Sequence, residues 1–158
     1  MSARLARRES ILPPFDCACA TVRRAARLVT QLYDEELRPQ IEVPQFALLS
    51  ALERYPDCKQ STLARGAGFD KTTISRNLAL MRRNGWIEDV HSDDPRDRRL
   101  RITATGQNLL RAAKPGWNRA QRRLSSAMTP EEWQKMWAAL DSLTNAAVKA
   151  REKKGVQR

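Results

Sequence analysis

The feature that most constrains the fold is a short segment, residues 63 to 76, with the spacing of a helix-turn-helix. Ala64 is small enough for two helices to approach closely, and Gly68 supplies the permissive turn between them. Ile74, six residues further on, is placed to pack the second helix against the first. Asp70 stands where it can cap that second helix. The segment therefore predicts two helices joined by a tight turn.

Directly after this segment, the sequence predicts a β-hairpin. Asn84 and Gly85 end the second helix in the pattern of a left-handed C-terminal cap. Two runs, 86–90 and 99–102, then alternate apolar with polar residues, as half-buried strands do. The segment 92–97 between them is charged and rich in turn-forming residues. A helix-turn-helix followed by a basic hairpin is the plan of a winged helix.

Helical patterns occupy most of the remaining chain. Apolar residues recur every three to four positions from residue 16 to residue 38, and a second helix is expected after Pro44. A long helix capped by Thr103 follows the hairpin, with a bend expected at 114–116. Thr129 and Glu132 form a capping box at the start of a final helix. With a short helix at 61–66, the predicted order is α-α-α-α-β-β-α-α, a mainly α fold.

The chain is predicted to form one winged helix-turn-helix flanked by helices that pair with a second copy. Trp133, Trp137 and Leu140 share one face of the last helix, and the winged unit is too small to cover both terminal helices. Packing of these helices on the chain's own core is the alternative. The expected segments are a flexible N-terminal arm (1–15), a helical dimerisation region (16–38 and 104–150), the DNA-binding unit (40–103) and a flexible basic tail (151–158).

Charge is distributed unevenly along the 158 residues, which carry a net charge of +11. The net charge is +4 over residues 1–30, −4 over 31–57, +4 over 58–103 and +7 over 111–158. Such an excess favours a polyanionic partner, here double-stranded DNA. A non-specific DNA-packaging protein and a protein–protein adaptor with a winged fold remain alternatives on composition and fold alone.

Candidate DNA-reading residues lie on the second helix of the motif and on the hairpin. Small hydroxyl residues followed by an arginine suit a helix that enters a major groove, although such runs also occur on solvated helix faces. The hairpin arginines suit the negative potential of a narrow minor groove. The helix candidates are Lys71, Thr72, Thr73, Ser75 and Arg76, and the wing candidates are Asp94, Arg96, Arg98 and Arg99.

These residues also carry a resemblance to a known family. The chain resembles the MarR-type (multiple antibiotic resistance regulator) transcription factors over roughly residues 16–150, and the wing pattern is the most specific part. The resemblance implies a homodimer with entwined terminal helices, a palindromic DNA site, Arg96 at the wing tip in the minor groove, and Asp94 paired with an arginine such as Arg76. It is carried by Leu63, Ala64, Gly68, Thr73 to Arg76, Asn84 to Ile87, Asp94 to Thr103 and Gly106.

The resemblance further implies a response to a signal, and we expect a repressor that leaves its operator when the signal arrives. A small aromatic carboxylate or phenolic effector would bind between the dimerisation helices and the winged unit, where an arginine can pair with a carboxylate and rings can stack. In the thiol-based alternative, Cys17 or Cys19 is oxidised near the start of the first helix. All of these side chains also suit ordinary core or surface positions. The pocket candidates are Arg23, Tyr33, Phe46 and Trp117.

Catalysis is not expected from this sequence, nor is a cofactor. There is no glycine-rich phosphate loop, no nucleophile set with a histidine, and no metal-spaced carboxylate pair. Cys17 and Cys19 with the distant His91 fall short of a zinc site. The three cysteines are too few for a disulfide scaffold, and no signal peptide or membrane span is recognisable. These features predict a cytoplasmic, non-membrane protein.

Overall fold

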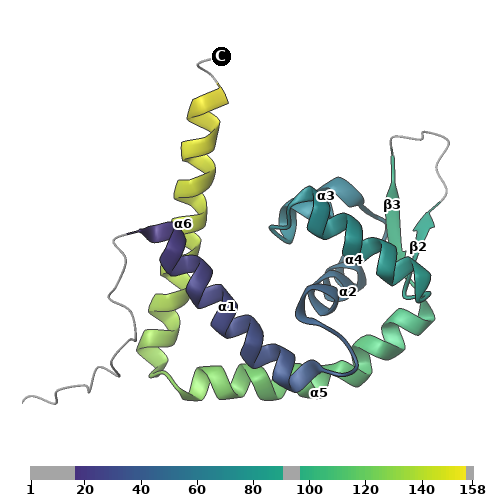
Figure 1. Ribbon diagram of the computed structural model, residues 1–158, viewed down its shortest axis with the longest axis horizontal. Coiled ribbons are helices and arrows are strands. Elements are labelled where there is room, and N and C mark those ends of the chain that lie inside the picture. The colour runs from purple at the N-terminus through teal and green to yellow at the C-terminus, as the bar shows by residue number, and fades with distance from the viewer. Residues whose placement is uncertain (1–16, 91–96, 156–158) are drawn as a thin grey trace, which may run out of the picture.

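The computed structural model describes residues 17–90 and 97–155, and it has the predicted mainly helical, winged architecture (Figure 1). The predicted order of helices and hairpin strands is confirmed, with one additional strand. The elements are α1 (Ala18–Leu37), α2 (Val43–Arg54), β1 (Cys58–Lys59), α3 (Gln60–Gly66), α4 (Lys71–Arg83), β2 (Ile87–Val90), β3 (Arg99–Ile102), α5 (Ala104–Ser126) and α6 (Pro130–Gly155).

The additional strand, β1, completes a small antiparallel sheet with the hairpin in the order β1-β3-β2. Cys58 pairs with Leu100, and Lys59 pairs with Arg99. The amide of Gln60 continues this ladder by donating to the carbonyl of Arg98 at 2.9 Å. A strand of two residues is too short to show an alternating pattern, so sequence periodicity could not predict it. Its role is to join the start of α3 to the base of the wing.

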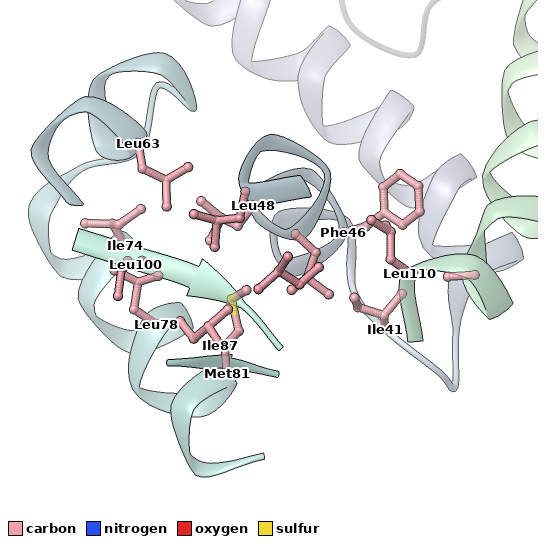
Figure 2. Close-up of a cluster of buried hydrophobic side chains, with 14 of the residues drawn as sticks. Ile41, Phe46, Leu48, Leu63, Ile74, Leu78, Met81, Ile87, Leu100 and Leu110 are labelled. Carbon is pink, nitrogen blue, oxygen red and sulfur yellow. The ribbon is translucent and has the colours of Figure 1, made fainter. Parts of the chain in front are cut away.

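The core lies between α2, α4 and the sheet, with α3 closing one end (Figure 2). Leu48, Leu78, Met81 and Leu100 have no exposed surface, and Ile74 is 3% exposed. The predicted stripe of α4, Ile74 with Leu78 and Met81, is therefore the face that anchors this helix. The opposite face of α4 is left to solvent.

Two glycines end helical segments where the sequence predicts tight turns. Gly68, between α3 and α4, has a φ of +67°, and Gly85, between α4 and β2, has the same value. Side chains with a Cβ rarely adopt this left-handed conformation, so glycine is the residue suited to both positions. The turns set the crossing of α3 with α4 and the direction in which the hairpin leaves α4.

Helix α5 connects the winged unit to the terminal helices, as Figure 1 shows. It contains Pro115 without interruption of the helix, and it curves beneath α2 in this view. Next to the proline, Gly116 packs so closely on α1 that a Cβ would collide with the carbonyl of Glu36. Arg119 and Arg123 then donate to the Glu36 carboxylate, each at 2.8 Å. Helices α1 and α5 are thus locked together at the C-terminal half of α1.

Helices α1 and α6 leave apolar surface uncovered. None of the described side chains of α6, residues 130–152, is buried, and Trp137 is 49% exposed. The capping box is confirmed, because the amides of Thr129 and Glu132 each donate to the other's side chain. Helix α6 runs to Gly155, so residues 151–155 of the segment expected to be a flexible tail are helical, since no helix breaker precedes that glycine. Large exposed apolar residues on the two helices are Val22, Leu28, Val29, Trp137, Leu140, Leu143 and Val148.

Within the described part of the chain, no helix is long and apolar enough to cross a membrane. No group of three or more potential metal ligands occurs among the described residues. The arm expected at residues 1–15 lies outside the described ranges.

Candidate nucleic-acid interface

The predicted DNA-reading residues in the N-terminal half of α4 differ in their exposure to solvent. Lys71, Thr72, Ser75 and Arg76 are exposed, on the side of α4 that faces away from the core. Thr73 is half-buried, and its hydroxyl donates to a carboxylate oxygen of Asp70 at 2.6 Å. The structure therefore leaves four of these side chains accessible, while that of Thr73 takes part in the local fold.

Asp70 fixes the start of α4 in the way that the sequence predicts. Its Oδ1 accepts from the amides of Thr72 and Thr73, both at 2.9 Å. The hydrogen bonds from Thr73 and the amide of Thr72 lower the pKa of the Asp70 carboxyl below its ordinary value. An ionised cap satisfies two of the amides that a helix start leaves without partners. The residues that follow Asp70 thereby gain a defined orientation.

The base of the wing is held by ion pairs around Asp97. Arg99 Nε donates to Asp97 Oδ2 at 2.8 Å, and Lys59 Nζ of β1 lies 2.9 Å from Oδ1. Arg99 first, and then Lys59, lower the pKa of this carboxyl. Arg98, by contrast, is exposed. Of the expected wing residues, Arg99 thus has a partner within the protein, and Arg98 is accessible to an outside one.

The wing-tip candidates lie outside the described residues. Asp94 and Arg96 fall in the segment 91–96, which separates β2 from β3. The expected pairing of Asp94 with Arg76 and the placement of Arg96 in a minor groove therefore stay predictions.

Two bidentate ion pairs that sequence reasoning missed hold the hairpin in place. Arg82 of α4 donates to both oxygens of Asp89 on β2, at 2.8 and 2.7 Å. Arg101 of β3 donates to both oxygens of Asp57, at 2.6 and 2.8 Å. The only signal for these pairs in the sequence is the charged residue that each has at a solvent-facing strand position, Asp89 on β2 and Arg101 on β3. Fork-shaped pairs of this kind fix orientation as well as distance, so α4 and the described strands of the hairpin form one unit, named the reading unit after the role proposed for it below.

Three of the four predicted pocket residues line one cavity of about 310 Å³ between α1, α2 and α5. The rings of Phe46 and Trp117 stack there at a centroid distance of 6.1 Å, with 14° between their planes. Tyr33 lines the same cavity and donates its hydroxyl to Gln121 Oε1, while burial raises its pKa. Arg23 does not line the cavity, because it lies on the exposed N-terminal half of α1.

A residue not predicted from sequence supplies the cation at this cavity. Lys114 of α5 is among the lining residues, and its Nζ lies 4.2 Å from the centroid of the Trp117 ring. It lies 6.0 Å from that of Phe46. Lys114 is three residues from Trp117 on the same helix, and this spacing is the signal that could have identified it. The cavity thus combines stacked rings with one ammonium group.

The two cysteines of the thiol hypothesis lie at the start of α1. Cys17 occupies the N-cap position and Cys19 follows in the first turn, and both are exposed. The carbonyl of Cys17 accepts from the amide and the hydroxyl of Thr21, both at 3.1 Å. Both cysteine residues are exposed in the described structure, as a thiol that reacts with a reagent in solution must be.

Comparison with known proteins places this geometry in a family. The sequence model of the MarR family matches residues 40–100, from just before α2 into β3. The transcriptional regulator HosA of Escherichia coli O111:H- is 29% identical over 74% of this chain and 87% of its own length. HosA of Escherichia coli O157:H7 is 30% identical over 65% of this chain and 76% of its own length.

Solved structures agree with the sequence comparison. The Mycobacterium tuberculosis transcriptional regulator MosR, crystallised in complex with DNA, is 34% identical and has a TM-score of 0.77, with 86% of this chain and 99% of that chain covered. PcaV of Streptomyces coelicolor, solved with its natural ligand, has a TM-score of 0.74 at 22% identity, with 86% and 97% covered. The named relatives are transcriptional regulators rather than enzymes. The chain, with its capped α4 and its wing, therefore belongs to the MarR family of DNA-binding transcriptional regulators.

Proposed function

We propose that this regulator is a homodimeric repressor that binds a palindromic operator and releases it when a small aromatic acid binds. The observation that carries the DNA-binding part is the exposed face of α4, where Lys71, Thr72, Ser75 and Arg76 follow a capped helix start. Side chains at the N-terminal end of a recognition helix are those that reach base edges in the major groove. Arg76 is the candidate for a bidentate contact with guanine.

The exposed apolar faces of α1 and α6 support the homodimer. Trp137, Leu140 and Leu143 form a stripe on α6, and each is at least 40% exposed. A second copy that covers this stripe would bring two α4 helices to one DNA face. Half-sites about 34 Å apart then account for a palindromic operator.

Arg76→Ala tests base reading by α4. A duplex selected from random DNA by the wild-type protein serves as the probe, with a scrambled duplex for comparison. We expect the variant to lose about 1–3 kcal/mol on the selected duplex and to keep its weak affinity for the scrambled one. Arg111→Ala, an exposed arginine on α5, is the control and should leave the preference unchanged. Equal affinity of the wild-type protein for both duplexes would instead indicate a non-specific DNA binder.

The cavity between α1, α2 and α5 supports the choice of an aromatic acid as effector. Phe46 and Trp117 offer ring faces, and Lys114 offers an ammonium that can leave its position over Trp117 to pair with a carboxylate. In BpsR of Bordetella bronchiseptica, a structural neighbour, DNA binding is regulated by 6-hydroxynicotinic acid, a ring acid of this kind. The cavity touches both α1 and α2, so its occupant can alter the angle between the terminal helices and the reading unit.

Calorimetry with paired ligands tests this assignment. The wild-type protein should bind 6-hydroxynicotinate more tightly than its neutral amide. Lys114→Met should weaken binding of the acid about tenfold, the loss of one charge-assisted hydrogen bond, and leave the amide unaffected. Lys149→Met, at an exposed site near the C-terminal end of α6, is the control. Absence of binding by any ring acid to the wild-type protein would exclude this pocket as the sensor for the class.

A thiol switch is the second candidate, favoured by the two exposed cysteines at the start of α1. Peroxide would oxidise the two thiols to a Cys17–Cys19 disulfide and be reduced to water, and this bond would change the helix start that positions α1. The wild-type protein should then release DNA under peroxide, while Cys17→Ser and Cys19→Ser should not. Cys58→Ser is the control, since Cys58 lies in β1. Release by both serine variants would exclude this switch.

A further inference from the structure

A groove of about 1000 Å³ separates the reading unit from the C-terminal end of α6. Lys71 and Ser75 of α4 belong to one wall, and Val148 and Arg151 of α6 belong to the other. Arg98 lines the groove from the base of the wing. Three parts of the chain that are distant in sequence thus face one another where α4 begins.

The charged residues that line this groove are predominantly cationic. Among those that the structure describes, the single carboxylate is that of Asp70, which is already engaged by the start of α4. A polyanion is the partner whose charge complements such a surface. The lining cations are Lys59, Arg65, Lys71, Arg98 and Arg151.

The face of α6 that reaches this groove changes from apolar to charged toward the C-terminal end of the helix. Leu140, Leu143 and Ala147 follow one another at helical spacing, and the next position on that face, four residues beyond Ala147, is Arg151. An apolar partner suits the earlier positions, whereas a charged partner suits Arg151. In Figure 1 the C-terminal end of α6 points to the same side of the molecule as the ends of β2 and β3 that lead into the wing.

We propose that Arg151 provides a third DNA contact, to a backbone phosphate between the two half-sites. This inference rests on the proposed function, because it needs α4 and the wing to hold DNA on this side of the molecule. Most of helix α6 belongs to the expected dimerisation region (104–150), so in the proposed dimer its C-terminal end would lie nearer the centre of the operator than α4 does. A phosphate contact there adds affinity on any sequence and leaves base preference to α4.

The salt dependence of binding tests the contact. Wild-type protein, Arg151→Gln and Arg151→Lys are titrated with the selected duplex at several salt concentrations. Each phosphate contact contributes about −0.9 to the slope of log K against log salt, so loss of two contacts per dimer should make the slope shallower by about 1.8. Arg151→Lys keeps a point charge and should retain the wild-type slope. Lys135→Gln, at the other end of α6 where Lys135 pairs with Glu131, is the matched control.

Three outcomes overturn the inference. Arg151→Gln could change the slope no more than Lys135→Gln does, or Arg151→Lys could behave like Arg151→Gln. Sedimentation could also show that Arg151→Gln weakens the dimer at an unchanged slope, which would assign the groove to the second copy. Failure of the proposed function has a different signature, namely that the wild-type protein does not distinguish the selected duplex from the scrambled one.

Discussion

At the scale of single residues, two glycines at helical positions have opposite surroundings. A Cβ at Gly116 of α5 would collide with the carbonyl of Glu36 on α1, whereas a Cβ at Gly66 would have no atom within 4 Å. The sequence indicates a bend at 114–116, and it does not reveal that α1 crosses there. Contacts between helices far apart in the chain depend on packing, which local spacing does not encode.

Gly116→Ala should therefore destabilise the protein, whereas Gly66→Ala should not. Alanine at 116 must push α1 away from α5 and should lower the free energy of unfolding by about 1–3 kcal/mol. Alanine at 66 lowers only the entropy of the unfolded chain and should be neutral or stabilising by up to about 1 kcal/mol. Urea denaturation of the two variants measures the difference. Similar stabilisation by both would show that the α1–α5 contact is not closely packed in solution.

The ion pairs at Asp97 give a prediction for acid conditions. Because Arg99 and Lys59 lower the folded pKa of Asp97, its contribution is complete above the unfolded pKa and disappears as pH falls through the folded pKa. Asp97→Asn should thus be less stable than wild type at pH 7, and this difference should shrink below about pH 4. Urea midpoints between pH 3 and pH 7 measure it. A difference that stays constant across this range would contradict the assignment.

The sequence predicted which side chains of α4 are exposed better than it predicted the hydrogen-bond and ion-pair partner of each residue. The exposure of Lys71, Ser75 and Arg76 follows from a stripe that the sequence shows. The hydrogen bond of Thr73 to Asp70 and the ion pair of Arg99 with Asp97 do not, because each depends on which rotamer the folded backbone allows. Lys114 replaces Arg23 at the cavity for the same reason, since only the fold shows which turn of a helix faces the space.

At the scale of elements, local signals predicted where most helices begin and end. The cap at Asp70 and the reciprocal cap at the start of α6 are short-range patterns, so a single sequence suffices to find them. Strand β1 was missed because its two residues are a strand only through their partner β3. The prediction thus succeeded where an element is stabilised by its own residues, and failed where another element stabilises it.

The cap of α4 should control DNA affinity. Asp70→Ala leaves the amides of Thr72 and Thr73 without partners, so the first turn of α4 should fray. We expect affinity for the selected duplex to fall roughly fivefold, as for the loss of one N-cap, and Asp70→Ser to restore most of it. Fluorescence anisotropy with a labelled duplex measures both variants. Equal loss with alanine and serine would show that the carboxylate acts on DNA binding in some way other than capping.

At the scale of the whole molecule, the net charge of +11 does not mark the reading face. The winged segment 58–103 carries +4, and the larger share, +7, lies in residues 111–158, most of which belong to α5 and α6. Charge on the connecting helices can steer approach to DNA from a distance, whereas in the proposed function a few exposed side chains on α4 discriminate between sequences. The net charge predicted a polyanionic partner. Only the fold shows which charged residues lie on the connecting helices and which lie on α4.

If a second copy of the chain covers the apolar stripe of α6, charged substitutions in the stripe should prevent dimerisation. Leu140→Glu combined with Leu143→Glu places two charges on this apolar face and should convert a dimer into monomers, measured by sedimentation. Loss of the second reading head should weaken binding to a palindromic duplex about a hundredfold. Ser142→Glu, on the opposite side of α6, is the control and should remain dimeric. A double variant that stays dimeric would place the contact between copies elsewhere.

Helix α5 mechanically couples the cavity to the hairpin. Its first turn is fastened to the hairpin, because the Thr103 hydroxyl donates to the Gly85 carbonyl at 2.6 Å and Gly106 packs against the Trp86 carbonyl. Its middle borders the cavity through Lys114 and Trp117. With 23 residues it is about 35 Å long, so a tilt of about 5° at one end displaces the other by about 3 Å. A displacement of that size is comparable to the rise of one base pair, enough to take a reading head out of register.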